Sequence, residues 1–332
     1  MSFSHGHFPA RRTTARITAS IIAVILLIIA VVGIIDDYRS YAKAKGAADG
    51  ASELFSVHYI DVGQGDATLI CSPSGKYMLV DCGPTANSAY LKKYLWDMGV
   101  ENLDYLLITH PHEDHYGGAS EIMESFSVKE LILHKELTEV YPYNRLIDMA
   151  EDYGTDVILT EMGDRFEFDG CAEFEILSPK YVDEDNLSEA SLCFRVEFGN
   201  TAFMFTGDAE EMSENFMLLS GKPLEADVLK AGHHGSSTSN TRDFVEAVNP
   251  VYAVVSCAEN NDYGHPHRET VRLFDDMDIE MLVTHQTDGV VFVSDGEEVT
   301  YVEDFFGNND SASEKTSDGN QNMFFRYISS RF

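Results

Sequence analysis

The chain has 332 residues, and 44% of them are hydrophobic, an ordinary proportion for a globular protein. It carries 23 Lys and Arg against 56 Asp and Glu, which gives a formal net charge of −33 at pH 7. Such a surface repels polyanions and argues against nonspecific DNA binding, because that binding depends on neutralising phosphates with basic side chains.

An apolar run near the N-terminus, residues 17–35 (ITASIIAVILLIIAVVGII), contains no charged side chain. At ~1.5 Å per helical residue it matches the ~30 Å hydrocarbon core of a bilayer. Arginines precede the run and aspartates follow it, so the positive-inside rule predicts a cytoplasmic segment (1–16), a transmembrane anchor and an external remainder. The alternative is a cleaved signal peptide, whose apolar run is usually shorter, about 7–15 residues.

After the anchor we expect a short polar linker (36–53), a folded domain (54–303) and an acidic tail (304–332) whose polar composition predicts disorder. Apolar runs separated by turn residues predict many strands with helices between them. Strands are expected at 55–62, 66–71, 76–83, 104–109, 128–134, 155–163, 166–179, 191–208 (a hairpin), 226–232, 250–258, 280–285 and 289–296, and helices at 87–98, 121–126, 144–154, 243–248 and 268–277. This order predicts two strand-rich halves, with mixed sheets covered by helices.

Residues 109–118 read THPHEDHYGG and concentrate metal-binding side chains directly after an expected strand. His110 and His112 are separated by a proline that opposes a helix, so in extended backbone both rings face the same way. Asp114 and His115 follow, where the paired glycines let the chain bend, and we expect them to face a second ion. Two divalent metals ~3.5–4 Å apart form a familiar hydrolytic centre.

This stretch resembles the signature of the metallo-β-lactamase superfamily. The segments HYIDVGQGDATLI, YMLVDCG, LLITHPHEDHYGG, FMFTGDAE, LKAGHHGSSTS and YGHPH occur in the order found in the extracellular hydrolase domain of ComEC-type competence proteins, across roughly residues 54–295. The resemblance implies an α+β fold, a four-layer αββα sandwich preceded here by one transmembrane helix, with a dinuclear metal site at one edge. It also implies a bacterial cell membrane protein with an extracellular catalytic domain, secreted if the N-terminal segment is cleaved.

The resemblance assigns metal-binding roles residue by residue. His110 and His112 would hold one metal, and Asp114 and His115 would hold the other. Asp208 in TGDAE matches the acid that bridges both metals, and His265 in YGHPH matches the late histidine that completes the second site. Both ions are expected to be divalent.

The AGHHGSS segment is open to two interpretations. One of its histidines, His234 ahead of His233, would be a metal ligand or a clamp for phosphate oxygens, helped by Ser236 and Ser237. In that interpretation the two histidines act in catalysis together with Asp114. The alternative is a structural loop whose histidines bond to carbonyl groups.

Three further acids are expected to support the site rather than to react. Asp81 matches a family aspartate that orients the metal-binding loop, and Asp61 and Asp66 flank the DVGQGD turn. Better-known relatives carry another histidine before the bridging acid, but the corresponding stretch here, DNLSEASLCFRV, has none. The first metal is therefore short of protein ligands, which leaves Zn²⁺ expected and Mn²⁺ as the alternative.

The predicted function is hydrolysis of a phosphodiester by a metal-activated water outside the membrane, and the resemblance implies DNA or RNA as the substrate. A role in DNA uptake would require a partner membrane protein, because one span cannot form a channel. The alternatives are a small phosphoester such as an envelope phosphocholine group, a β-lactam, and a catalytically silent binding domain of the same fold. The intact HPHEDH motif argues against the silent domain.

Overall fold

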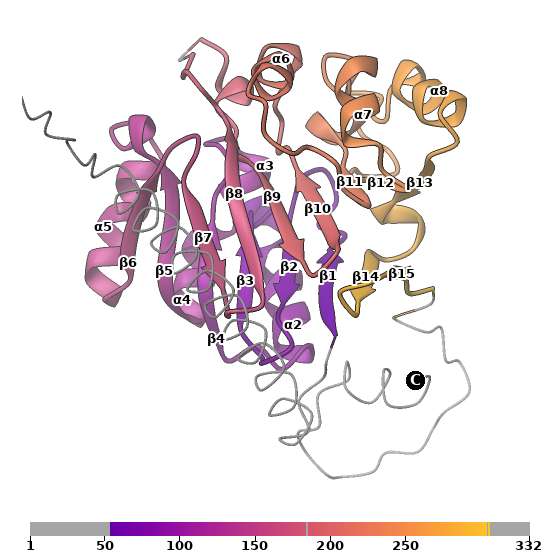
Figure 1. The fold of residues 1–332 in the computed structure, drawn as a ribbon. Helices are drawn as coiled ribbons and strands as arrows, with labels where there is room; N and C mark the ends of the chain where they lie inside the picture. The colour runs from indigo at the N-terminus through magenta and orange to yellow at the C-terminus, as the bar shows by residue number, and fades with distance from the viewer. Residues whose placement is uncertain (1–53, 184, 304, 306–332) are drawn as a thin grey trace, which may run out of the picture. The chain divides into compact units, whose positions relative to one another are not determined.

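The computed structural model describes residues 54–183, 185–303 and 305, which form two β-sheets and the helices that cover them (Figure 1). The first sheet has the strand order β15-β14-β1-β2-β3-β4-β5-β6, and the second has the order β13-β12-β11-β10-β9-β8-β7. The first sheet comprises β1 (Phe55–Tyr59), β2 (Thr68–Cys71), β3 (Tyr77–Val80), β4 (Asn102–Leu107), β5 (Ser127–His134), β6 (Asp156–Thr160), β14 (Val290–Ser294) and β15 (Val299–Tyr301). The second comprises β7 (Arg165–Phe168), β8 (Ala172–Ser178), β9 (Cys193–Phe198), β10 (Thr201–Phe205), β11 (Val228–Lys230), β12 (Tyr252–Val255) and β13 (Glu280–Val283).

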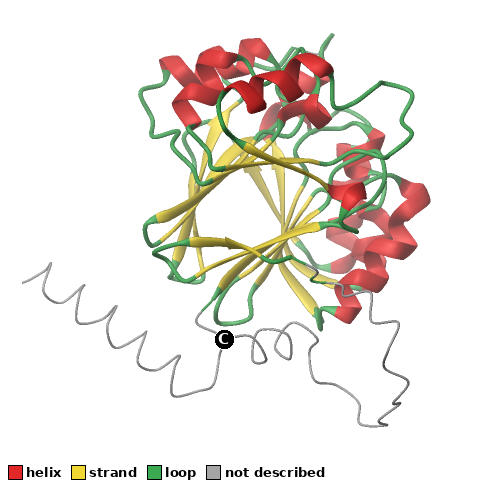
Figure 2. Cartoon of the chain, turned by 90° about the vertical axis from the view of Figure 1, so that its right-hand side faces the viewer, coloured by secondary structure: helices red, strands yellow, loops and turns green. Residues whose placement is uncertain are grey.

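The helices lie on the outer faces of the two sheets (Figure 2). They are α2 (Ser88–Asp97), α3 (Glu113–Tyr116), α4 (Ala119–Ser125), α5 (Tyr143–Tyr153), α6 (Glu211–Leu219), α7 (Arg242–Val248) and α8 (Arg268–Asp276). Two short 3-10 turns matter for the site, η3 (Leu187–Ala190) and η4 (Gly232–Gly235).

Three buried clusters define the layers. Aromatic side chains from both sheets, such as Phe55, Phe194 and Phe292, fill the space between the sheets. A second cluster joins the first sheet to α2, α4 and α5, and a third joins the second sheet to α6, α7 and α8. Each sheet is therefore apolar on both faces, as a sheet packed on two sides requires. The predicted αββα sandwich agrees with this arrangement.

Strand direction determines which loops meet. In the first sheet β3, β4, β5 and β6 are parallel, and in the second β10, β11, β12 and β13 are parallel. The segments that follow β3, β4, β10 and β11 contain the predicted metal-binding motifs. Parallel strands place their carboxyl ends at one edge of a sheet, where loops from different parts of the chain converge.

The structure differs from the expected elements in several places. The stretch 166–179 is a hairpin of β7 and β8 rather than one strand, and α6 was not predicted at all. The one-turn helix α3 falls inside the HPHEDH motif, where we expected a loop.

The membrane anchor at 17–35 lies outside the described residues, as do 1–16, the linker 36–53 and all of 304–332 except Phe305. Among the residues that the structure describes, no helix is both long enough and apolar enough to cross a membrane.

Candidate metal centre

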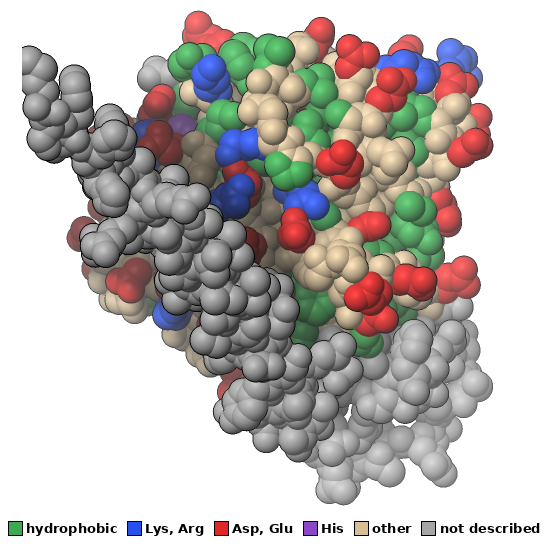
Figure 3. Space-filling model, in the orientation of Figure 1, with side chains coloured by type: hydrophobic (Ala, Val, Ile, Leu, Met, Phe, Trp, Pro, Cys, Tyr) green, Lys and Arg blue, Asp and Glu red, His purple; other side chains and the backbone are tan. Residues whose placement is uncertain are grey.

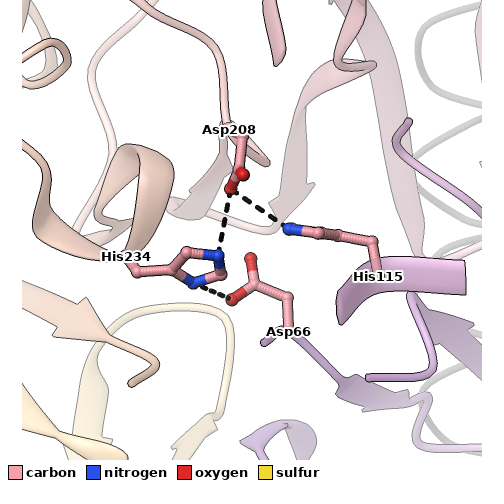
Figure 4. Close-up of side chains that lie close together, drawn as sticks. All are labelled: Asp66, His115, Asp208 and His234. Carbon is pink, nitrogen blue, oxygen red and sulfur yellow. Dashed lines mark ion pairs between the residues drawn. The ribbon is translucent and has the colours of Figure 1, made fainter. Parts of the chain in front are cut away.

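Metal-binding side chains from both sheets meet at the carboxyl ends of their strands. His110, His112 and Asp208 form one group of possible ligands, and Asp66, His115, Asp208 and His234 form another (Figure 4 shows the second). Within each group the candidate ligand atoms lie within 4.8 Å of one another. Asp208 belongs to both groups, which is the position that a bridging carboxylate must occupy.

The first group comes from the HPH segment after β4. Nε2 of His110 lies 2.9 Å from Nδ1 of His112 and 3.6 Å from Oδ2 of Asp208. His110 is buried, whereas His112 is half-buried and lines the cleft described below. Two ring nitrogens this close, facing one carboxylate oxygen, can bind a common cation.

The second group joins the two sheets. Nε2 of His115 lies 3.2 Å from Oδ1 of Asp208, and Nε2 of His234 lies 3.5 Å from the same oxygen. Both histidines and Asp208 are buried. Asp114 is on the cleft side of this group, with Oδ2 3.2 Å from Nε2 of His234.

Asp81 fixes the orientation of His115. Its carboxylate accepts hydrogen bonds from the backbone N–H and the hydroxyl of Thr109 at 2.8 and 2.7 Å. The other partner is Nδ1 of His115, 2.8 Å from Oδ2. A proton held at Nδ1 by this carboxylate leaves Nε2 free to face Asp208, which is the arrangement that aims a histidine ligand at a metal. The predicted supporting position of Asp81 agrees with this geometry.

Ser191 holds the other side of the centre, and the sequence analysis did not single it out. Its Oγ lies 3.2 Å from Nδ1 of His110 and accepts the backbone N–H of Asp208 at 3.0 Å. Ser191 lies in the stretch where better-known relatives carry a histidine. Only the missing histidine could have drawn attention to Ser191 in the sequence, because a serine in a polar segment is otherwise common.

Asp66 and Lys230 form a buried ion pair beneath His234. Nζ of Lys230 lies 2.9 Å from Oδ2 of Asp66, and Oδ1 of Asp66 lies 3.3 Å from Nδ1 of His234. Nδ1 of His234 is also 2.9 Å from the carbonyl oxygen of Ser256, to which it donates. Asp66 therefore lies among the candidate ligands, closer to the centre than the supporting position we predicted. Lys230 was one of several cations that could not be placed from sequence.

His233 and His265 lie at the edge of the centre and outside both ligand groups. Nε2 of His233 is 3.7 Å from Oδ2 of Asp208, and its Nδ1 is 3.3 Å from Oε1 of Glu210. The ring centroid of His265 lies 6.0 Å from that of His234. The structure thus places His234, rather than His265, beside His115 in the second group.

The remaining predicted residues lie farther from the centre. Asp61 accepts the backbone N–H of Gly63 at 3.0 Å and stabilises its own turn. Ser237 bonds through its backbone N–H and hydroxyl to Nδ1 of His267, and Ser236 bonds to Thr238. Neither serine lines the cleft, so the structure does not support their predicted contact with substrate.

The paired glycines after the motif are required for close approach rather than for a bend. Gly117 and Gly118 both have negative φ, at −50° and −79°. A Cβ on Gly118 would lie 2.5 Å from the carbonyl oxygen of Cys82, and one on Gly117 would lie 2.5 Å from the backbone nitrogen of Thr85. The glycines therefore let the segment after β4 pack directly against the segment after β3.

Unusual backbone conformations cluster at the centre. Asp81, His233 and His234 have φ of 57°, 49° and 55°, the left-handed region that residues other than glycine rarely adopt. Such conformations cost about 1–3 kcal/mol each and persist where surrounding contacts impose them. Here they place the rings of His233 and His234 beside Asp208 and the carboxylate of Asp81 against His115.

The charges and unpartnered atoms of the centre fit a bound cation. Among the described residues, Nε2 of His115, Oδ1 of Asp208 and Oδ1 of Asp66 are buried without a hydrogen-bond partner. Burial opposes ionisation of Asp208, but His115 and His234 outweigh it and hold the pKa of Asp208 well below its usual value. Burial likewise opposes protonation of His234, but Asp208 and Asp66 raise its pKa to about 10. The carboxylates therefore attract positive charge to the point where the histidine nitrogens converge, and a divalent cation supplies that charge.

The centre opens into a cleft of about 340 Å³. It is lined by Gln64, His112, Glu113, Asp114, Asp208, His233, His234, Tyr263 and His265. Histidine and acidic side chains dominate this lining, and it includes no lysine or arginine. Fold and site together define a metal-binding hydrolase scaffold in which both sheets contribute ligands.

Comparison with known proteins identifies the family. Residues 60–259 match the metallo-β-lactamase superfamily, and the chain belongs to that superfamily, whose members are generally metal-dependent hydrolases. It is 29% identical to "ComE operon protein 3" of Bacillus subtilis over 69% of its length, and 31% identical to "Competence protein ComA" of Neisseria gonorrhoeae over 62%. It is also 33% identical to "Recombination protein 2" of Haemophilus influenzae over 64% of its length. These homologues are ComEC-type competence proteins, as the sequence motifs indicated.

The chain spans only a part of these relatives, matching 32% of the length of the Bacillus subtilis protein, 27% of the Neisseria gonorrhoeae protein and 25% of the Haemophilus influenzae protein. Among solved structures, the fold is similar to that of Zn(2+)-bound PqqB from Methylobacterium extorquens, with a TM-score of 0.50 and 11% identity. That alignment covers 71% of this chain and 99% of the other.

Proposed function

We propose that this protein is a metal-dependent phosphodiesterase that binds two divalent cations at the carboxyl ends of its strands. The observation that carries the proposal is the shared position of Asp208. Its Oδ2 faces the HPH pair and its Oδ1 faces His115 and His234. A single carboxylate between two sets of histidine nitrogens is suited to bridging two cations.

Zinc is the expected metal. Each ligand group supplies two histidine nitrogens together with carboxylate oxygens, and Zn²⁺ prefers such nitrogen-rich sets. Mn²⁺ is the alternative, because the first group has only three protein ligands among the described residues and leaves room for water.

The chain's own residues divide the remaining tasks. When bound, the cations would supply Lewis acidity toward phosphoryl oxygens and an activated water. Asp81 and Ser191 hold the ligands His115 and His110 in orientation. His233 lines the cleft with Nδ1 held by Glu210, and with a second proton on Nε2 its ring would donate a hydrogen bond to a phosphoryl or leaving-group oxygen.

The substrate we propose is a phosphodiester, with DNA as the first candidate because one relative is named a competence protein and another a recombination protein. The acidic character of the chain limits how such a substrate binds. Figure 3 shows acidic side chains spread over the face it draws, with basic ones scattered among them. Binding would therefore depend on the two cations at one phosphate rather than on a row of lysine and arginine side chains that neutralise successive phosphates.

Membrane attachment and location are further parts of the proposal. The apolar segment 17–35 would anchor the chain and place the hydrolase domain outside a bacterial cell membrane. A role in DNA uptake would then require a partner membrane protein that forms the channel.

The test is hydrolysis of bis(p-nitrophenyl) phosphate by the full-length, zinc-loaded chain and by the His110→Ala and Asp208→Ala variants. We expect both variants to lose at least about a hundredfold in kcat/KM, because each removes a ligand from the centre. Asp152→Ala, on the exposed face of α5, is the control and should retain activity. Full activity in Asp208→Ala would contradict the proposed centre.

Two further substrates separate the alternatives. Cleavage of single-stranded DNA would support a nuclease, and cleavage of a p-nitrophenyl ester of phosphocholine alone would support the small-phosphoester alternative. Metal binding without hydrolysis of any ester would identify a silent binding domain.

A further inference from the structure

An exposed aromatic ring stands at the mouth of the candidate centre. Tyr263 lines the cleft together with the metal-binding histidines, and 66% of its surface is exposed. Large apolar side chains on a surface need no explanation when they occur singly and far from a site. This one lies beside the reacting position, where a substrate must pass or bind.

Tyr263 is held in a fixed position. Its ring stacks on that of His265, with centroids 5.6 Å apart and an interplanar angle of 17°. Nε2 of His267 lies 3.2 Å from the carbonyl oxygen of Tyr263. Asn261 stabilises the same loop, because its amide oxygen accepts the backbone N–H of His265 and its amide nitrogen donates to the carbonyl of Ala258. One face of the ring is thus covered by His265, and the exposed surface belongs to the rest of the ring.

Gln64 adds an unused hydrogen-bond donor to the same cleft. Its Oε1 accepts the backbone N–H of Ala258, in the loop that carries Tyr263, at 3.4 Å. Its Nε2 is buried and has no hydrogen-bond partner among the described residues. A buried donor without a partner is unfavourable, and a rotation of the Gln64 amide into the cleft would let a ligand supply the missing acceptor.

The charge of the cleft limits the chemical classes of ligand that can bind there. Among the described residues, the lining includes Glu113 and Asp114 and no lysine or arginine, so a second anionic group on the ligand, beyond the scissile phosphate, would find no cationic partner there. A rigid aromatic face and an amide donor instead favour a flat ring that carries hydrogen-bond acceptors. Nucleobases have both properties, and stacking on an aromatic side chain strengthens the binding of any base.

We propose that Tyr263 and Gln64 form a binding subsite for a nucleobase next to the metal centre, so that the phosphodiester substrate carries a nucleoside. This inference rests on the proposed function. A quaternary ammonium group, as in phosphocholine, is the competing ligand, because it also binds aromatic faces. Such groups are recognised by cages of several aromatic rings, whereas Tyr263 is the only phenylalanine, tyrosine or tryptophan in the lining of this cleft in the described part of the chain.

Equilibrium binding to the full-length, zinc-loaded chain tests the proposal without requiring turnover. The ligands are thymidine 5′-monophosphate, methyl phosphate and phosphocholine, measured by isothermal titration calorimetry. We expect the wild-type chain to bind thymidine monophosphate about tenfold more tightly than methyl phosphate. Tyr263→Leu should abolish this preference, Tyr263→Phe should retain it, and Gln64→Leu should reduce it about fivefold. Tyr153→Leu, which changes another exposed tyrosine, on α5, is the control and should bind as the wild type does.

Two results would overturn the subsite. One is an unchanged preference for thymidine monophosphate in Tyr263→Leu. The other is a greater loss of affinity for phosphocholine than for the nucleotide in the same variant. Hydrolysis of the p-nitrophenyl ester of thymidine monophosphate separates the subsite from the proposed function. Nucleobase preference without hydrolysis would support the subsite and contradict the phosphodiesterase.

Discussion

At the scale of single residues, the centre depends on side chains that hold the ligands as well as on the ligands themselves. Asp81 and Ser191 do not face the cleft, yet each bonds a histidine whose other ring nitrogen points toward Asp208. A histidine whose Nδ1–H is fixed can present only Nε2 to a metal. Asp81 and Ser191 therefore determine which ring nitrogen of each histidine faces the metal site.

Asp81→Asn tests this positioning role. The amide keeps one oxygen for Thr109 but places an N–H₂ group or a weaker acceptor against Nδ1 of His115. We expect zinc affinity to fall about 10- to 100-fold while the fold is retained, as is typical for the partners of ligating histidines. Competition titration against a zinc-binding dye measures the affinity, and circular dichroism verifies the fold. Asp61→Asn is the matched control, because Asp61 bonds only within its turn, and equal losses in both variants would contradict the assignment.

Much of the site was predictable at this scale, and the limits have a physical basis. His110, His112, Asp114 and His115 stand in one compact motif after a strand, so local spacing identified them, whereas Asp208 was assigned only through the family resemblance. Ser191, Lys230 and Gln64 reach the centre only through contacts across the sandwich. A lone serine, lysine or glutamine carries no local pattern that distinguishes it from a surface residue, and only tertiary structure brings it into place.

At the scale of elements, strands and hairpins followed from alternating apolar residues and turn signals, whereas α6 did not. Its N-terminus is stabilised from a distance by Glu189 in η3. The Glu189 carboxylate accepts backbone N–H groups of Glu210, Met212 and Ser213 at 3.3, 2.9 and 2.9 Å. The capping residue lies more than twenty positions upstream, so no capping pattern stands beside the helix in the sequence.

Glu189→Ala should therefore destabilise the domain. The variant leaves three backbone donors at the start of α6 without an acceptor, and Glu189 is only 4% exposed. We expect the free energy of unfolding to fall by about 2 kcal/mol, the upper range for the loss of a helix cap. Urea denaturation followed by tryptophan fluorescence measures it. Glu211→Ala, an exposed acid in the first turn of the same helix, should change stability by less than about 0.5 kcal/mol, and an equal loss there would count against the capping role.

At the scale of the whole molecule, the layered fold buries a histidine that is separate from the centre. His58 in β1 is buried between Ser56 and Tyr94, with ring nitrogens 3.0 Å from the Ser56 hydroxyl and 2.8 Å from that of Tyr94. Burial lowers the pKa of His58 to about 3. Burial also raises the pKa of Tyr94 well above its usual value, so its hydroxyl stays neutral across the pH range in which His58 titrates.

This burial predicts a pH dependence of stability. The unfolded chain takes up a proton on His58 near pH 6.5, but the folded chain does so only near pH 3. The contribution of neutral, buried His58 to the free energy of unfolding is therefore full above pH 6.5, and it decreases as the pH falls toward 3. Between pH 7 and pH 5 the loss amounts to about 2 kcal/mol. His58→Gln should show a pH dependence weaker by that amount in urea denaturation, and identical slopes would contradict the prediction.

The proposed centre requires that two cations share Asp208, and the number of metal ions bound per chain tests this requirement. The full-length chain is loaded with zinc, dialysed and measured by elemental analysis together with the His110→Ala and Asp208→Ala variants. We expect the wild-type chain to retain two zinc ions, the His110→Ala chain to retain one, and the Asp208→Ala chain to retain none. Two ions retained in Asp208→Ala, or a folded wild-type chain that binds none, would contradict the proposed centre.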